Sequence, residues 1–137
     1  VSNIFVHSDL AEMRLYPCAY SLTLNVSGSR LNAILNQRSQ DMLVANNWNV
    51  AQYAALVLMF AQVSGLEPGE LVHVIADAHI YDRHIPLVER MLSLPPYEAP
   101  QLVMDEAIRD FYAFRPEHFR LINYRYHEGP GKIPVAV

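Results

Sequence analysis

Cysteine is almost absent from this sequence: Cys18 is the only one among 137 residues. A single cysteine cannot form a disulfide within its own chain, which excludes a fold held together by internal disulfides. A reducing compartment is the natural setting for such a thiol, and we expect the protein to be cytoplasmic. The thiol can therefore serve either as a small buried side chain or as a reactive group.

Positive charge and long apolar runs are scarce as well. Ten lysines and arginines are scattered among fourteen acidic residues, and the net charge is −4. Nucleic acids and anionic membranes select clustered basic residues, so we expect no nucleic-acid partner and no membrane partner. The longest apolar run, 53–61, is far shorter than the roughly 20 residues that a membrane-spanning helix needs. Any anionic ligand must be bound by a few local side chains.

The residues that are present suit a single folded unit over 1–137, because 52% of them are hydrophobic and no flexible linker or repeat divides them. Apolar and polar residues alternate over 20–26 and 30–38, on both sides of Ser27-Gly28-Ser29, and this pattern predicts a β-hairpin. Residues 49–63 predict a long helix that ends at Ser64-Gly65, with an asparagine of the preceding Asn-Asn-Trp-Asn as its N-cap.

Further patterns complete the predicted fold class. We expect strands at 2–6, 69–81, 99–104 and 119–124 and a short helix at 85–93. Together these elements predict an α+β fold, with a mixed or antiparallel sheet packed on the long buried helix. That helix is apolar around most of its circumference, so a sheet and a partner subunit or a further segment would be needed to bury it.

Two neighbouring segments could carry chemistry. Cys18 follows Pro17, which restricts the backbone where the first hairpin strand begins. The segment Gln37 to Asp41 (QRSQD) lies at the end of the second hairpin strand and contains Arg38 and Ser39, which could donate hydrogen bonds to a phosphate. An arginine facing Cys18 would favour its thiolate form. The sulfur could equally be an inert core atom, and the polar segment a solvated turn.

Polar groups elsewhere suit a polar ligand. The side-chain amide at the start of the long helix has a donor and an acceptor, as does the edge of a pyrimidine ring. The segment Asp77 to His84 (DAHIYDRH) holds two histidines, two aspartates and a tyrosine, and in an extended chain His79 and Tyr81 share one face. Neither HExxH nor CxxC occurs here, so we expect these two to form hydrogen bonds and expect no metal.

Taken in order, these blocks resemble the carboxy-terminal half of a thymidylate synthase. The resemblance rests on PCAY at Cys18, QRSQD, the Trp48-Asn49 start of the helix with Tyr53 after it, DAHIYDRH, and the terminal PVAV. It implies a methyltransferase that converts dUMP to dTMP, with 5,10-methylenetetrahydrofolate as the one-carbon donor and reductant. It also implies a homodimer.

The resemblance assigns catalytic roles to Cys18, Arg38 and Asp41 and a substrate-binding role to Ser39. Cys18 corresponds to the nucleophile that adds to C6 of the uracil and so makes C5 nucleophilic. Arg38 would hold the nucleotide phosphate and favour the thiolate, and Ser39 would add a hydroxyl to the nucleotide's hydrogen bonds. Asp41 corresponds to the acidic residue that contacts the pterin of the folate.

The remaining binding residues follow from the same resemblance. Asn49 would pair with the uracil edge and distinguish it from cytosine. His79 and Tyr81 would bind the 3′-hydroxyl of the deoxyribose. Val135 and Ala136 belong to the carboxy-terminal tail that would close over the bound folate and exclude water.

The chain departs from the common family pattern in several places. Ala19 stands where many relatives have a histidine after the nucleophile, Ala45 lies in a segment where many have Leu-Gly-x-Pro-Phe-Asn, and Ala76 replaces a glycine. The chain begins with Val1 and is shorter than a full-length member, so we expect a carboxy-terminal fragment that is weakly active or inactive alone. Two other functions stay open: a deoxycytidylate hydroxymethylase, which typically has aspartate in place of Asn49, and a non-catalytic nucleotide-binding or dimerising fragment.

Overall fold

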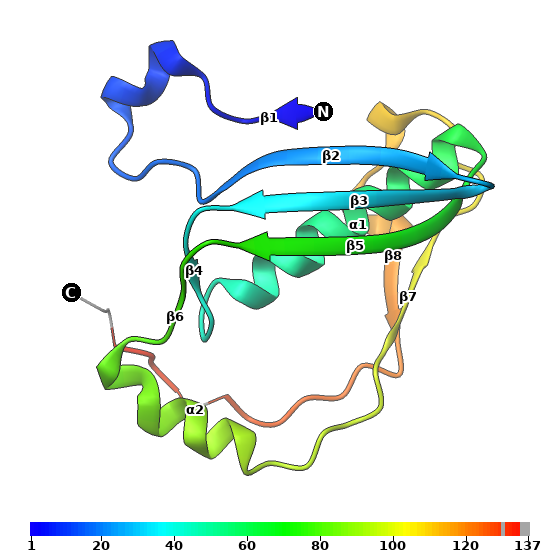
Figure 1. The fold of residues 1–137 in the computed structure, drawn as a ribbon. Helices are drawn as coiled ribbons and strands as arrows, with labels where there is room; N and C mark the ends of the chain where they lie inside the picture. Colours follow the sequence, from blue (N-terminus) through cyan, green and yellow to red (C-terminus); the bar gives the residue numbers. More distant parts are fainter. Residues whose placement is uncertain (130, 135–137) are drawn as a thin grey trace. The chain divides into compact units, whose positions relative to one another are not determined.

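The computed structural model describes residues 1–129 and 131–134 and divides the chain into two compact units, Val1–His79 and Ile80–Val137. The first unit contains a four-stranded sheet, a pair of two-residue strands and a long helix (Figure 1). Its elements in chain order are β1 (Ser2–Asn3), η1 (His7–Glu12), β2 (Ala19–Ser27), β3 (Arg30–Gln37), β4 (Gln40–Asp41), α1 (Asn46–Ser64), β5 (Glu67–Ile75) and β6 (Ala78–His79). Within the described ranges, no helix is both long and apolar enough to cross a membrane.

The hairpin that the alternating pattern predicts is confirmed. Ser27 pairs with Arg30 across β2 and β3, which leaves Gly28 and Ser29 as the two turn residues. Gly28 has a φ of 62°, and glycine adopts this left-handed conformation without steric cost. A glycine with positive φ at the first of two turn positions is typical of a type II′ hairpin turn, whose twist matches that of the strands.

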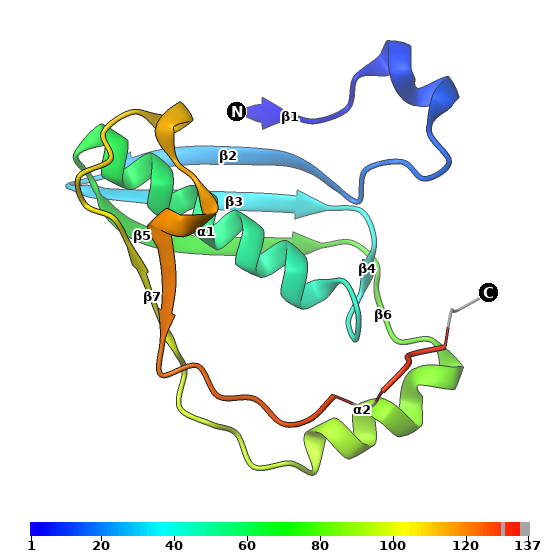
Figure 2. The ribbon, with the colours of Figure 1, turned by 180° about the vertical axis from the view of Figure 1, so that it is seen from behind.

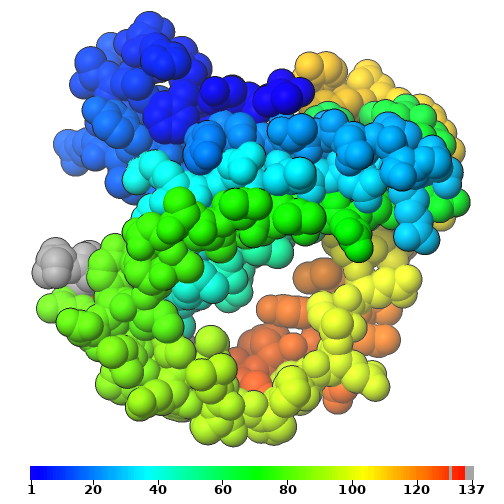
Figure 3. All heavy atoms as spheres, in the orientation of Figure 1, coloured from blue at the N-terminus to red at the C-terminus, as the bar shows by residue number. Residues whose placement is uncertain are grey.

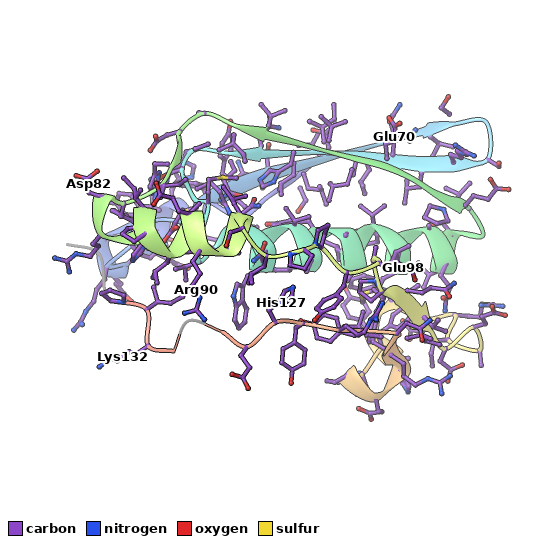
Figure 4. The ribbon with its side chains drawn as sticks, turned by 90° about the horizontal axis from the view of Figure 1, so that it is seen from below. Glu70, Asp82, Arg90, Glu98, His127 and Lys132 are labelled. Atoms are coloured by element: carbon purple, nitrogen blue, oxygen red, sulfur yellow. The ribbon has the colours of Figure 1, made fainter. Side chains whose placement is uncertain are left out.

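The sheet is mixed, in agreement with the predicted fold class. Its strand order is β1-β2-β3-β5: the β1–β2 and β2–β3 pairs are antiparallel, and the β3–β5 pair is parallel. The parallel pairing requires a crossover, which α1 provides by running across one face of the sheet (Figures 1 and 2). Seen along its edge, the sheet forms one layer and α1 a second, with side chains between them (Figure 4).

The core of the first unit lies between these two layers. Leu22 from β2 and Leu35 from β3 are buried against α1, and Leu35 has no exposed surface. Tyr53, Val57 and Ala61 are the buried residues of α1, and their four-residue spacing places them on one side of the helix. The described residues therefore bury one side of α1. The composition of α1 predicts burial on nearly every side, and the described residues do not provide it.

The opposite face of the sheet carries exposed apolar side chains. Ile34 of β3 and Val72 and Val74 of β5 are 43%, 48% and 48% exposed. They alternate with the residues that face α1, as the two-residue period of a strand requires. Figure 3 shows this face, with atoms of β2, β3 and β5 at the surface.

The predicted carboxy-terminal end of α1 is confirmed, and its predicted N-cap is wrong. The helix ends at Ser64, and Gly65 follows with a φ of 66°, which is the predicted glycine stop. The predicted asparagine N-cap is wrong, because the N-cap is Ala45, whose side chain makes no capping hydrogen bond. The Asp41 carboxylate accepts hydrogen bonds from the N–H groups of Leu43 and Val44, which precede the helix, so it orders the turn that leads into α1.

Two predicted strands have different bounds in the structure. The single strand expected at 69–81 is divided into β5 and β6, because the main chain leaves the sheet after the N–H of Ala76 donates to Gln37. The two-residue β6 then pairs in parallel with β4 instead of β3. The first strand covers only 2–3, and not 2–6.

The described part of the second unit contains one α-helix, three short 3₁₀ helices and one antiparallel pair of strands. Its elements are η2 (Asp82–His84), α2 (Ile85–Leu92), β7 (Gln101–Met104), η3 (Phe111–Ala113), η4 (Pro116–His118) and β8 (Phe119–Ile122). β7 and β8 pair antiparallel, so the two predicted strands are confirmed with shorter bounds. His84, which is 1% exposed, lies 2.8 Å through its Nε2 from the carbonyl oxygen of Pro134.

Candidate active site

The open end of the β2–β3 hairpin brings Cys18 and Arg38 together. Ala19 and Gln37 pair across the hairpin, so the residues just beyond them are neighbours. The N–H of Arg38 donates to the carbonyl of Cys18 at 2.9 Å, and Arg38 Nη2 lies 3.8 Å from Cys18 Sγ. A guanidinium at this distance can donate a hydrogen bond to the sulfur.

The Arg38 side chain is held by main-chain carbonyls. Its Nε donates to Pro17 at 3.0 Å, and its Nη2 donates to Tyr16 at 2.8 Å. These two nitrogens form one edge of the planar guanidinium group. Nη1 has no hydrogen-bond partner among the described residues, and Arg38 is exposed, so two N–H donors remain for a ligand. The arginine is thus oriented before any anion binds.

A buried amide, Gln37, belongs to the predicted segment 37–41, but the sequence assigned it no role of its own. Gln37 is 2% exposed and ends β3 on the face that packs against α1. Its Nε2 donates to the carbonyl of Ser39 at 2.9 Å and to Asn49 Oδ1 at 3.2 Å, and its Oε1 lies 2.9 Å from His73 Nε2. One side chain therefore joins β3, the loop after it, α1 and β5.

His73, which was not among the predicted site residues, lies on β5 and is partly buried. Burial lowers its pKa from the ordinary value of 6.5, which favours the neutral ring near neutral pH. The sequence contains a weak indication that Gln37 and His73 have a role. Each occupies an inward position of an alternating strand, where the other inward residues include Leu35 and Leu71.

Ser39 and His79 are joined by Asp77, a third residue that was not assigned a role. Ser39 Oγ donates to Asp77 Oδ2 at 3.3 Å, and His79 Nδ1 lies 3.3 Å from the same oxygen. The β4–β6 pairing positions them, because Gln40 N–H donates to the Asp77 carbonyl and Met42 N–H to that of His79. Ser39 and His79 are therefore held close together, as a shared ligand would require.

Asp41 and Asn49 lie at the two ends of the connection into α1. Asp41 Oδ1 accepts from the N–H groups of Leu43 and Val44 at 3.0 and 3.2 Å, an aspartate turn that directs the chain into the helix. Asp41 Oδ2 has no hydrogen-bond partner in the described part of the chain. Asn49 follows in the first turn of α1, where its Oδ1 accepts from Gln37.

The other predicted site residues are not brought into this cluster by any described contact. Tyr81 is the second residue of the second unit, is 40% exposed, and packs its ring edge-on to His84 with 5.6 Å between centroids. Val135 and Ala136 lie outside the described residues. No group of three or more histidine, cysteine, aspartate or glutamate side chains that could hold a metal ion occurs in the part of the chain that the structure describes.

A separate cavity of about 340 Å³ lies in the first unit between β1, β2 and α1. Its lining includes Tyr20, Tyr53 and Phe60, and none of the predicted site residues contributes to it. Burial raises the pKa of Tyr53 above its ordinary value of 10.0, so this phenol stays neutral over the usual pH range.

Comparison with known proteins identifies the family. The family model for thymidylate synthase matches residues 1–137. The structure is similar to that of the thermostable thymidylate synthase A from Bacillus subtilis, with a TM-score of 0.89 and 35% sequence identity. The match covers 99% of this chain and 48% of that one, so the chain spans about half the length of this relative. The sequence motifs, the mixed sheet and both comparisons agree: the chain belongs to the thymidylate synthase family.

Proposed function

We propose that the protein containing this chain methylates dUMP to dTMP, with 5,10-methylenetetrahydrofolate as cosubstrate. The observation that carries the proposal is the pairing of Cys18 Sγ with Arg38 Nη2 at 3.8 Å in a chain of this family. Uracil C5 is a poor carbon nucleophile while the ring is conjugated, and addition of a thiolate at C6 removes that conjugation. Because the chain spans about half of the relative, the activity is proposed for the whole protein.

In this proposal Arg38 has two tasks. Its Nη1 donors bind the phosphate of the nucleotide, while its Nη2 donates a hydrogen bond to Cys18 Sγ. The carbonyls of Tyr16 and Pro17 hold the guanidinium in place, so little side-chain freedom is lost when the anion binds. The hydroxyl of Ser39 adds a further hydrogen bond to the nucleotide.

Asn49 reads the base in this proposal. Its amide has an N–H donor for the C4 carbonyl of uracil and an oxygen acceptor for N3–H. His79 and Tyr81 bind the 3′-hydroxyl of the sugar. The proximity of His79 to Ser39 supports this role, because His79 Nδ1 and Ser39 Oγ each lie 3.3 Å from Asp77 Oδ2.

The folate, when bound, supplies the one-carbon unit and the hydride that reduces it. Asp41 is the described residue that fits this cosubstrate, because its Oδ2 is left to accept a hydrogen bond from a pterin N–H. Val135 and Ala136 belong to the tail proposed to close over the folate and exclude water. We also propose a cytoplasmic location, where Cys18 stays reduced.

The proposal includes a homodimer. Ile34, Val72 and Val74 form an exposed apolar strip on the sheet face that α1 leaves uncovered. A flat apolar strip of this kind is costly in water and is typical of a subunit interface. A second copy of the chain packed on the same face would bury the strip in both subunits.

Covalent capture of a nucleotide tests the proposed function. Full-length protein is incubated with dUMP and methylenetetrahydrofolate while the absorbance of dihydrofolate is followed. It is also incubated with 5-fluoro-dUMP and the folate, and its intact mass is measured. Turnover and a mass increase located on Cys18 are expected, and both should be lost in Cys18→Ser. A folded dimer that gives neither result would contradict the proposal.

The alternatives give different results in the same assays. A deoxycytidylate hydroxymethylase would prefer dCMP to dUMP as substrate, against the expectation from the Asn49 amide. A non-catalytic nucleotide-binding module would bind dUMP reversibly, and its mass would stay unchanged. Each result separates one alternative from the methyltransferase.

A further inference from the structure

We propose that His73 is a positioning residue that fixes, through Gln37, the orientation of the Asn49 amide. The inference rests on the proposed function in one respect, namely that Asn49 faces the pyrimidine. His73 itself lies on β5, and Gln37 stands between it and Asn49. Its contribution would be to the choice between uracil and cytosine and not to the chemical step.

The direction of the hydrogen bonds follows from one carbonyl group. The Ser39 main-chain oxygen can only accept a hydrogen bond, so the Gln37 atom at 2.9 Å from it must be the amide nitrogen. The Gln37 oxygen therefore faces His73 Nε2 at 2.9 Å, and it can only accept. His73 must then carry a proton on Nε2, which fixes the tautomer of its neutral ring. Burial, which lowers the pKa of His73, supports the neutral form.

The same reasoning fixes the orientation of the Asn49 amide. Gln37 Nε2 is 3.2 Å from Asn49 Oδ1, so the asparagine oxygen accepts and its nitrogen keeps both N–H donors. Asn49 thus offers N–H donors and one remaining oxygen lone pair to a ligand. A uracil edge, with a carbonyl beside an N–H, matches this order of groups, whereas a cytosine edge, with an amine beside an acceptor, opposes it. His73 is therefore the last residue in a series of hydrogen bonds that orients the Asn49 amide to favour uracil.

Without the His73 donor, Gln37 would have a weaker preference for one orientation. Its oxygen would be left without a partner in a side chain that is only 2% exposed, which is an unfavourable state for a polar atom. Rotation of the amide would then be opposed chiefly by the Ser39 carbonyl. The net value of one hydrogen bond corresponds to a loss of about 2- to 10-fold in the preference for uracil over cytosine.

Two variants of the full-length protein test the inference. His73→Leu removes the donor, and His73→Gln keeps a side-chain N–H of similar reach. The measurement is the ratio of the dissociation constants of dCMP and dUMP by titration calorimetry. We expect His73→Leu to lower this ratio by about 2- to 10-fold and His73→Gln to restore most of it. A merely structural role would weaken both nucleotides equally and leave the ratio unchanged, which would overturn the inference.

A measurement on the wild-type protein tests the predicted tautomer of His73 directly. Nitrogen-detected NMR of the His73 ring distinguishes its two tautomers, and we expect the proton on Nε2. A proton on Nδ1 alone would overturn the inference. Wild-type protein that binds dUMP no better than dCMP would overturn the proposed role of Asn49 and this inference with it. A clear preference that His73→Leu leaves unchanged would overturn the role of His73 only.

Discussion

Replacing Gln37 by methionine tests whether the buried amide stabilises the fold as well as the site. Methionine has a similar length and volume, so the substitution removes polar atoms and leaves no large cavity. The change disconnects three partners that come from separate parts of the chain: the Ser39 carbonyl, Asn49 Oδ1 and His73 Nε2. Each of these groups then needs a new partner or stays unpaired.

The expected magnitude follows from the number of hydrogen bonds lost. A typical intramolecular hydrogen bond contributes about 0.5 to 1.5 kcal/mol net, so loss of the three Gln37 bonds lowers the free energy of unfolding by about 3 kcal/mol. Domains of ordinary stability unfold with about 5 to 15 kcal/mol, so this loss is easily measured. It is also large for a substitution that conserves volume.

Urea unfolding followed by circular dichroism is the assay, with the transition midpoint and slope fitted together. Gln101→Met is the matched control, because Gln101 is an exposed glutamine on β7 and its replacement should change stability by less than about 0.5 kcal/mol. A loss below about 1 kcal/mol for Gln37→Met, within the range of a single hydrogen bond, would refute the reasoning.

Two further predictions concern stability. Gly69→Ala should lower the free energy of unfolding by about 1 to 3 kcal/mol, measured by urea unfolding, because a Cβ at this position would collide with the Asn32 side chain and lie 2.8 Å from the Leu31 carbonyl oxygen. A change within error would contradict it. His73 should make stability pH-dependent. Its folded pKa is lowered, so its contribution is complete above its ordinary value of 6.5 and is lost as the pH falls through the folded pKa. The unfolding midpoint should therefore fall less on acidification in His73→Gln than in wild type, and identical profiles would count against the prediction.

Local patterns were sufficient for most of the elements. Gly28 and Gly65 both adopt positive φ, and both were placed correctly, because the turn and the helix end depend on a few adjacent residues. The division of the strand at 69–81 was missed for the opposite reason. It depends on Gln37 accepting from the Ala76 N–H, a contact between residues far apart in the sequence. No alternation pattern contains that information.

Part of the site was predictable from the sequence, and part was not. Cys18 and Arg38 are distant in sequence, but the hairpin register makes them neighbours, so their pairing followed once the hairpin was predicted. The role of Gln37 within its predicted segment, and His73 altogether, were missed, because a polar residue at a core position indicates only a break in the pattern. What gives these two side chains their role is their mutual hydrogen bond across the parallel strands.

The residues proposed to react and the turn of the β2–β3 hairpin lie at opposite ends of the hairpin. Arg38 and Cys18 lie at one end of β3, and Gly28 lies beyond the other end, across a strand of eight residues. At roughly 3.3 Å of rise per residue, the two ends are about 26 Å apart. The tip is therefore a natural attachment point for a fluorophore or an affinity tag. A reporter placed there would follow assembly of the protein while the only thiol of the chain stays available for reaction.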